Sequence, residues 1–125
     1  MLVSCCVKEA GKTIQDSIDD IREAIDFCRY YVEEAKIILK EKDLPGPTGE
    51  KNIYQLKGRG LTCVISPWNF PIAIFVGQMI ASLVCGNVTI AKPAEQTSNI
   101  SYVIFKLLLS AGLPKNAAAL ILGKG

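Results

Sequence analysis

Apolar side chains recur at alternating spacings of four and three residues from Thr13 to Glu41. This spacing predicts one long amphipathic helix, because residues so separated share a face. We expect the apolar stripe to pack on a sheet, with a coiled coil as the alternative. The acidic residues on the other faces of the helix, Asp20 among them, should form an ordinary solvated surface. The stripe consists of Ile14, Ile18, Ile21, Ile25, Cys28, Val32, Ala35 and Leu39.

The pattern changes after this helix. Residues 44–49, LPGPTG, contain two prolines and two glycines and predict a linker or a wide turn. Asn52 to Lys57 alternates apolar and polar side chains, which is typical of an exposed strand. Beyond Gly58-Arg59-Gly60, the apolar run Leu61 to Ile65 predicts a buried strand, which we expect to be central in its sheet.

The rest of the chain alternates helices with apolar strands. Pro71 is suited to the start of a helix, since its missing N–H would be unpaired there. From Leu61 onward the pattern is β-α-β-α-β, which predicts an α/β fold with a partial Rossmann-like parallel sheet and right-handed crossovers. The later elements are a helix over Ile72–Val84, a strand over Asn87–Ala91, a helix capped by Thr97 or Ser98 and running to about Ala111-Gly112, and a strand over Ala117–Leu122.

Charge is distributed unevenly along the chain. Residues 1–59 carry ten basic and eleven acidic side chains, and residues 60–125 carry four and one, so the second half should supply most of the core. The uncharged run Gly60–Ala91, 32 residues, is long enough to cross a bilayer. It is interrupted by prolines and amides, which favours buried core over a membrane span. The net charge of +2, without a basic run, argues against nucleic acid as a partner.

The five cysteines show no C-x-x-C spacing, and the chain has no histidine. This excludes the usual zinc sites, predicts no metal and no disulfide framework, and favours a reducing cytoplasm. The N-terminal residues lack the basic region of a signal peptide. We expect every cysteine to be structural: Cys28 on the helix stripe, Cys63 in a buried strand, Cys85 near a helix end, and Cys5 and Cys6 near the start.

Parallel sheets bind ligands beyond the carboxyl ends of their strands, which directs attention to two loops. In the first, ISPWNFP, Pro67 and Pro71 restrict the backbone around Asn69. A side-chain amide held in this way can donate a hydrogen bond to an oxyanion. The alternative is that Asn69 caps the following helix and Trp68 fills the core.

The second loop contains Lys92 and Glu95, the only charged residues between Gly60 and Phe105. Dinucleotide-binding sheets recognise ribose hydroxyls at this position. The alternative is that both charges are simply solvated. No G-x-G-x-x-G follows the first strand, which argues against an ordinary Rossmann fingerprint.

Several motifs together resemble the aldehyde dehydrogenase superfamily: ISPWNFP, GN followed by IAKPAEQT, AGLP and the final LGKG occur in its order and at its separations. EAGKTIQDSIDDIREAIDFCRYY, GPTGEKN and WNFPIAIFVGQ resemble more closely the glutamate-semialdehyde (pyrroline-carboxylate) dehydrogenase part of bifunctional proline utilization flavoproteins. The similarity covers nearly the whole chain.

The resemblance implies NAD-dependent oxidation of glutamate semialdehyde, a small-molecule aldehyde, to glutamate in proline catabolism. FAD would belong only to a separate proline dehydrogenase domain of the parent. Asn69 would be the oxyanion donor, and Asn52–Lys57 a strand used for homo-oligomerisation or for binding a complementing chain. Cofactor contacts would be Ile65, Ser66, Pro67 and Trp68 on the nicotinamide side, Lys92 and Glu95 at the adenosine ribose, and Gly125 near the adenine.

The family's catalytic cysteine segment, F-x-x-x-G-Q-x-C, its general-base segment, E-L-G-G-K, and a later glycine-rich turn of the NAD site would lie beyond Gly125. We therefore expect a partial NAD-binding domain that is inactive alone, with N-terminal helices (1–43), a linker and oligomerisation strand (44–60) and the β-α-β-α-β unit (61–125). The alternative is a non-catalytic nucleotide-binding or subunit-interaction module.

Overall fold

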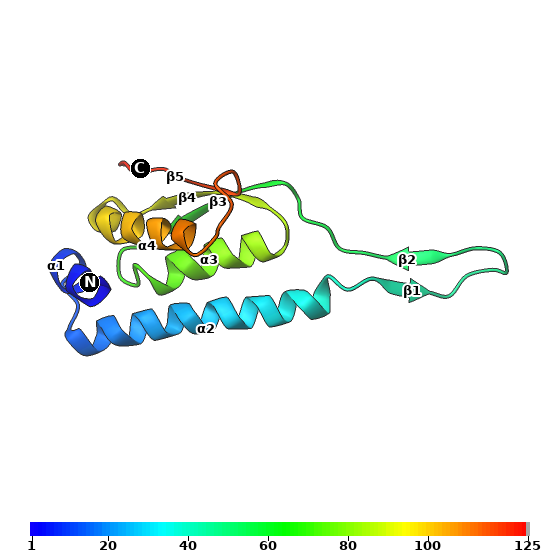
Figure 1. Cartoon of the computed structure of the whole chain (residues 1–125), viewed down its shortest axis with the longest axis horizontal. Coiled ribbons are helices and arrows are strands. Elements are labelled where there is room, and N and C mark those ends of the chain that lie inside the picture. Colours follow the sequence, from blue (N-terminus) through cyan, green and yellow to red (C-terminus); the bar gives the residue numbers. More distant parts are fainter. Residues whose placement is uncertain (125) are drawn as a thin grey trace.

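A parallel three-stranded sheet, helices beneath it and a projecting hairpin make up residues 1–124, the part of the chain that this computed structural model describes (Figure 1). The elements in chain order are α1 (Leu2–Ala10), α2 (Ile14–Ile38), β1 (Lys42–Leu44), β2 (Asn52–Tyr54), β3 (Leu61–Ser66), α3 (Ala73–Val84), β4 (Val88–Pro93), the 3-10 helix η1 (Glu95–Thr97), α4 (Ser98–Ser110) and β5 (Ala118–Leu120).

The predicted β-α-β-α-β unit is confirmed, with small shifts of its element boundaries. Strands β3, β4 and β5 are parallel, Leu61 pairs with Val88, and Thr89 pairs with Ala118. The prediction that β3 is central is wrong, because β4 lies between β3 and β5. An apolar run indicates that a strand has neighbours on its faces and says nothing of its place in the order of strands.

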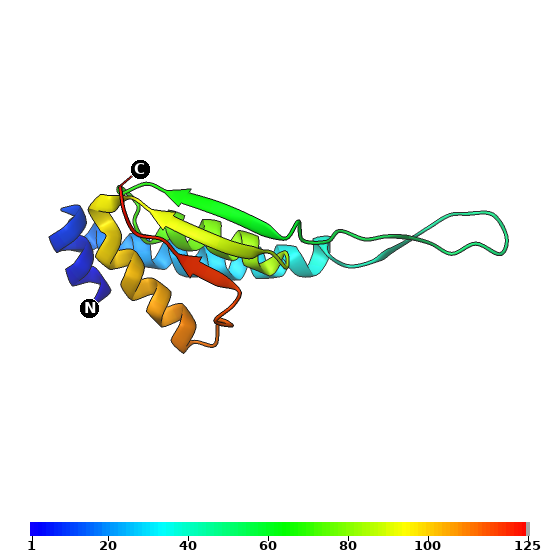
Figure 2. The same ribbon diagram turned by 90° about the horizontal axis from the view of Figure 1, so that it is seen from above.

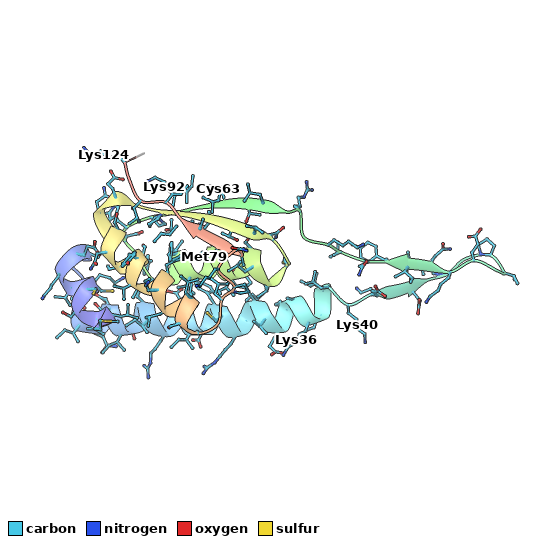
Figure 3. All side chains as sticks on the ribbon, turned by 45° about the horizontal axis from the view of Figure 1, so that its top comes forward. Lys36, Lys40, Cys63, Met79, Lys92 and Lys124 are labelled. Carbon is cyan, nitrogen blue, oxygen red and sulfur yellow. The ribbon has the colours of Figure 1, made fainter. Side chains whose placement is uncertain are left out.

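The core lies between the sheet and helices α3 and α4. Phe75, Met79 and Ile100 are fully buried there, as is Ala91 of β4. Figure 3 shows Met79 inside this layer. Full burial of one such large side chain contributes about 1.5–3 kcal/mol. Within residues 1–124 no helix has the length and apolarity needed to cross a membrane.

Helix α2 packs against α3 and not on the sheet, so the predicted sheet contact is wrong (Figure 1). Its buried face is formed by Ser17, Asp20 and Ala24, whereas Ile14 of the predicted stripe is 66% exposed. Small side chains let the two helices approach closely. A Cβ added at Gly77 of α3 would lie 2.9 Å from the ring of Phe27.

A tight turn joins α1 to α2. Gly11 ends α1 with φ of 65°, a left-handed conformation that glycine adopts without steric cost. Thr13 begins α2 as predicted, since its Oγ1 accepts from the amide of Asp16 at 3.1 Å. The turn between them brings Lys12 toward the loop that follows β3.

The N-terminus of α4 is capped by a residue that is distant in sequence. Glu9 of α1 accepts from the amides of Asn99 and Ile100 at 2.8 and 2.7 Å. The prediction that Thr97 or Ser98 caps this helix is wrong for their side chains: Thr97 occupies the N-cap position without a side-chain cap bond, and the Ser98 hydroxyl donates to Glu95. A charged acceptor at a helix N-terminus is also favoured by the helix dipole.

The hairpin β1–β2 extends as an arm away from the sheet and helices (Figures 1 and 2). Its strands are antiparallel, and Lys42 pairs with Tyr54. Strand β2 is shorter than the predicted Asn52–Lys57, and β1 was not predicted, because α2 ends at Ile38 rather than at Glu41 and KDL has no alternating pattern. A lone two-stranded hairpin gains little stability by itself.

Replacing Glu9 with alanine should destabilise the chain by about 0.5–2 kcal/mol, because two amides of α4 lose their acceptor. Urea denaturation of Glu9→Ala beside the unmodified chain measures the loss. Glu50→Ala in the exposed arm is the matched control and should unfold at the unmodified midpoint. Equal midpoints for Glu9→Ala and Glu50→Ala would contradict a capping role.

Candidate functional site

Asn69 lies in the loop between β3 and α3, and its side chain is locally constrained. Its Oδ1 accepts from the backbone amide of Phe70 at 3.2 Å, and its backbone oxygen accepts from Lys12. Within residues 1–124, the hydrogen bonds of Asn69 use only these two oxygens. The Nδ2 group therefore remains available as a donor on an exposed residue.

The alternative that Asn69 caps α3 is wrong. The N-cap position is Ile72, which has no side-chain cap bond. The carboxylate of Asp20, fully buried on α2, instead accepts from the amides of Ile72 and Ala73 at 3.4 and 2.9 Å. Trp68 does not fill the core either, because it is 53% exposed. Because Asp20 already accepts from the first amides of α3, Asn69 is not needed as its cap and can form other bonds.

The second pair of predicted residues lies at the carboxyl end of β4. Lys92 is part of the strand and not of the following loop, and its register partner on β3 is Ile65. Its Nζ donates to the backbone oxygen of Pro93 at 3.3 Å. Glu95 is exposed at the start of η1. Lys92 thus lies beside the end of β3, where Ser66 is buried and Pro67 is exposed, and Glu95 follows β4 two residues after its end.

The side of the sheet opposite the helices is uncovered in the described residues (Figure 2). Ile65 is 68% exposed on it, and Figure 3 shows Cys63 and Lys92 projecting from this side. The prediction that Cys63 is buried is therefore wrong, because alternate residues of β3 face the open side. An apolar face with one lysine near the strand ends fits a nucleoside better than a free phosphate.

Dinucleotide-binding sheets usually hold the diphosphate at the N-terminus of a helix. Here Asp20 occupies the N-terminus of α3, and Glu9 occupies that of α4. A second anion at either place would meet a carboxylate. The described residues therefore fit the nucleoside parts of a dinucleotide and provide no free helix terminus for its diphosphate.

Burial makes two of the cysteines poorly suited to nucleophilic catalysis. Burial raises the pKa of the Cys6 thiol to about 11, with a further contribution from the negative charge of Asp20. Burial also raises the pKa of Cys28. Among residues 1–124 no group of histidine, cysteine and acidic side chains is arranged to hold a metal ion. Gly125, predicted near an adenine, lies outside the described residues.

A family model, that of the aldehyde dehydrogenase family, matches residues 1–125. The chain belongs to the aldehyde dehydrogenase family. Members of this family generally use NAD(P), and the predicted fold class and resemblance are confirmed.

Similar proteins include enzymes named for proline metabolism. The chain is 42% identical over 124 residues to the bifunctional protein PutA of Rhizobium meliloti, covering 99% of this chain and 9% of PutA. It is 38% identical to 1-pyrroline-5-carboxylate dehydrogenase of Staphylococcus aureus, covering 98% and 24%. A solved structure of a proline utilization A (PutA) variant from Bradyrhizobium japonicum has a TM-score of 0.96 at 47% identity, covering 99% and 13%. The chain thus spans about a tenth to a quarter of the length of these relatives.

Three polar residues that join the N-terminal helices to the rest of the fold were not recognised from sequence: Glu9, Lys12 and Asp20. The pattern grouped Asp20 with the solvated acids of α2. A usable signal was its spacing from Ser17 and Ala24, which places three short side chains on one helical face. Nothing in the sequence distinguishes the acceptor role of Glu9.

Proposed function

We propose that this chain forms the oxyanion-donating and nicotinamide-facing part of an NAD-dependent aldehyde dehydrogenase that oxidises glutamate semialdehyde to glutamate in proline catabolism. The observation that carries the proposal is Asn69, whose Oδ1 is bonded within its own loop while its Nδ2 bonds to no group of the described residues. The names of the PutA and pyrroline-carboxylate dehydrogenase relatives support the choice of substrate.

The chemical role of Asn69 follows from its donor. When a nucleophile attacks an aldehyde, the carbonyl oxygen becomes an alkoxide, and a pre-positioned N–H stabilises that charge more than it stabilises the ground state. A bound NAD would supply the acceptor for the hydride that leaves the same carbon. Ser66, Pro67 and Trp68 lie directly before Asn69, and Ile65 is beside Lys92 on the open face. We assign these residues to the cofactor side of the site, with Lys92 and Glu95 at the ribose.

We further propose that residues 1–125 do not oxidise the aldehyde on their own, because none of their cysteines is placed as the nucleophile. Cys6 and Cys28 are disfavoured as thiolates by burial. Cys63 is in the middle of β3, away from the loop of Asn69. The free cysteines of the described residues are consistent with a reducing compartment, and we propose the cytoplasm.

Catalysis can be tested in a chimera in which this chain replaces the matching segment of Rhizobium meliloti PutA. Asn69→Ala should lower kcat for glutamate semialdehyde about 100- to 1,000-fold, the usual loss for one oxyanion donor, with little change in NAD affinity. Asn116→Ala, at an exposed position after α4, is the matched control. A loss below tenfold would remove Asn69 from this role.

Cofactor binding can be tested on the chain itself by two-dimensional amide NMR with and without NAD. Peaks of Trp68, Lys92 and Glu95 should shift, and Lys92→Met should weaken the response, whereas Lys115→Met should leave it unchanged. Dispersed spectra that do not respond to NAD would refute cofactor binding by these residues. Binding without activity in the chimera would favour the alternative, a non-catalytic nucleotide-binding module.

We also propose that the β1–β2 arm joins subunits or a complementing chain. Its side chains Leu44 and Ile53 are 50% and 43% exposed, and a hairpin of this size needs a partner surface. Ile53→Lys should weaken self-association about 10- to 100-fold, the effect of losing one buried apolar side chain. Sedimentation across concentrations measures this, with Ile37→Lys on α2 as the exposed apolar control. A monomer at every concentration would contradict self-association.

A further inference from the structure

The side chain of Lys12 packs against the loop that carries Asn69. This side chain is only 11% exposed, although lysine is ordinarily a surface residue. Its Nζ donates to the backbone oxygen of Asn69 at 3.0 Å and lies 4.4 Å from the centre of the Phe70 ring. These contacts replace part of the hydration that a mostly buried lysine side chain loses.

Asp20 supplies the opposite charge without being the nearest partner of Lys12. Its Oδ2 is 3.6 Å from Nζ, whereas its two oxygens accept the amides of Ile72 and Ala73. The shorter contact of Lys12 is therefore to the loop. The pair holds the loop at two points, with the cation on the carbonyl of Asn69 and the carboxylate on the first amides of α3.

We propose that Lys12 is a positioning residue for Asn69 and that Asp20 is its counter-ion. This inference rests on the proposed role of Asn69 as oxyanion donor. The peptide group between Asn69 and Phe70 is planar. Lys12 donates to its carbonyl oxygen, and the Oδ1 of Asn69 accepts from its N–H. Fixing the carbonyl end fixes the N–H end, so Lys12 determines where Oδ1 is held and where Nδ2 points.

The effect on the chain itself can be measured by NMR relaxation. Lys12→Met keeps most of the aliphatic stem under Phe70 and removes the donor. It should lower the backbone order parameter of Phe70 from the rigid range, about 0.85, to below about 0.6. Lys36→Met is the matched control, because Lys36 forms an exposed ion pair with Glu33 at 2.7 Å. An unchanged order parameter at Phe70 would overturn the inference.

The effect on catalysis needs a double-mutant cycle in the PutA chimera. Lys12→Met should lower kcat about 10- to 100-fold, since misplacement of a catalytic group by about 1 Å can cost this much, and should leave the KM for NAD unchanged. In the Asn69→Ala background the same substitution should cost less than about twofold, because the group that it positions is gone.

The outcomes separate this inference from the proposed function. Equal losses in both backgrounds would reveal a general structural effect and overturn the positioning role, while a large loss for Asn69→Ala alone would leave the proposed function intact. No loss for Asn69→Ala would refute both. If Lys12→Met does not fold, two other variants take its place in the same cycle. Lys12→Arg retains a cationic donor, and Asp20→Asn removes the counter-ion. Equal losses in both backgrounds would again overturn the inference.

Discussion

The carboxylate of Asp20 at the N-terminus of α3 is the interaction on which the arrangement of the site depends. A helix that begins directly after a loop leaves amide donors that need acceptors, and these donors are buried here. Asp20, which lies on α2, accepts two of these amides, and α2 itself packs mainly against α3. A single buried side chain thereby joins α2 to the start of α3, directly after the loop of Asn69, and this junction cannot shift without breaking charge-assisted bonds.

The same solution recurs at α4, where Glu9 of α1 accepts two amides. Both crossover helices of the β-α-β-α-β unit thus begin on a carboxylate from the N-terminal helices. The absence of a glycine-rich turn after β3 agrees with this arrangement, because such a turn brings backbone close to a phosphate, and a phosphate at these helix N-termini would meet a carboxylate. In the described residues, the strand ends and the open face of the sheet are the surfaces that remain for the proposed cofactor contacts.

The sequence predicted the helices and strands well and the polar contacts between them poorly. Elements such as Leu61–Ser66 and Ala73–Val84 follow from hydrophobic patterning and turn residues, because the spacing of apolar residues and the positions of turn residues are local properties of the sequence. The order of strands, the exposure of Cys63 and the burial of Asp20 depend on partners distant in the chain. Strand β1 was missed for the same reason, since KDL becomes a strand only through its pairing with β2. Of the site, Asn69 could be proposed from its two flanking prolines, but its freedom to donate could not.

That freedom follows from a division of roles between two residues of similar chemistry. Asparagine and aspartate both cap helices, and either could have served α3. Because Asp20 is the acceptor, the Oδ1 of Asn69 can bond within its own loop, and its Nδ2 bonds to no group of residues 1–124. A carboxylate at residue 69 would repel an oxyanion, and an amide at residue 20 would lose the charge that faces Lys12. The buried charge and the exposed amide are therefore not interchangeable, and the loop needs both.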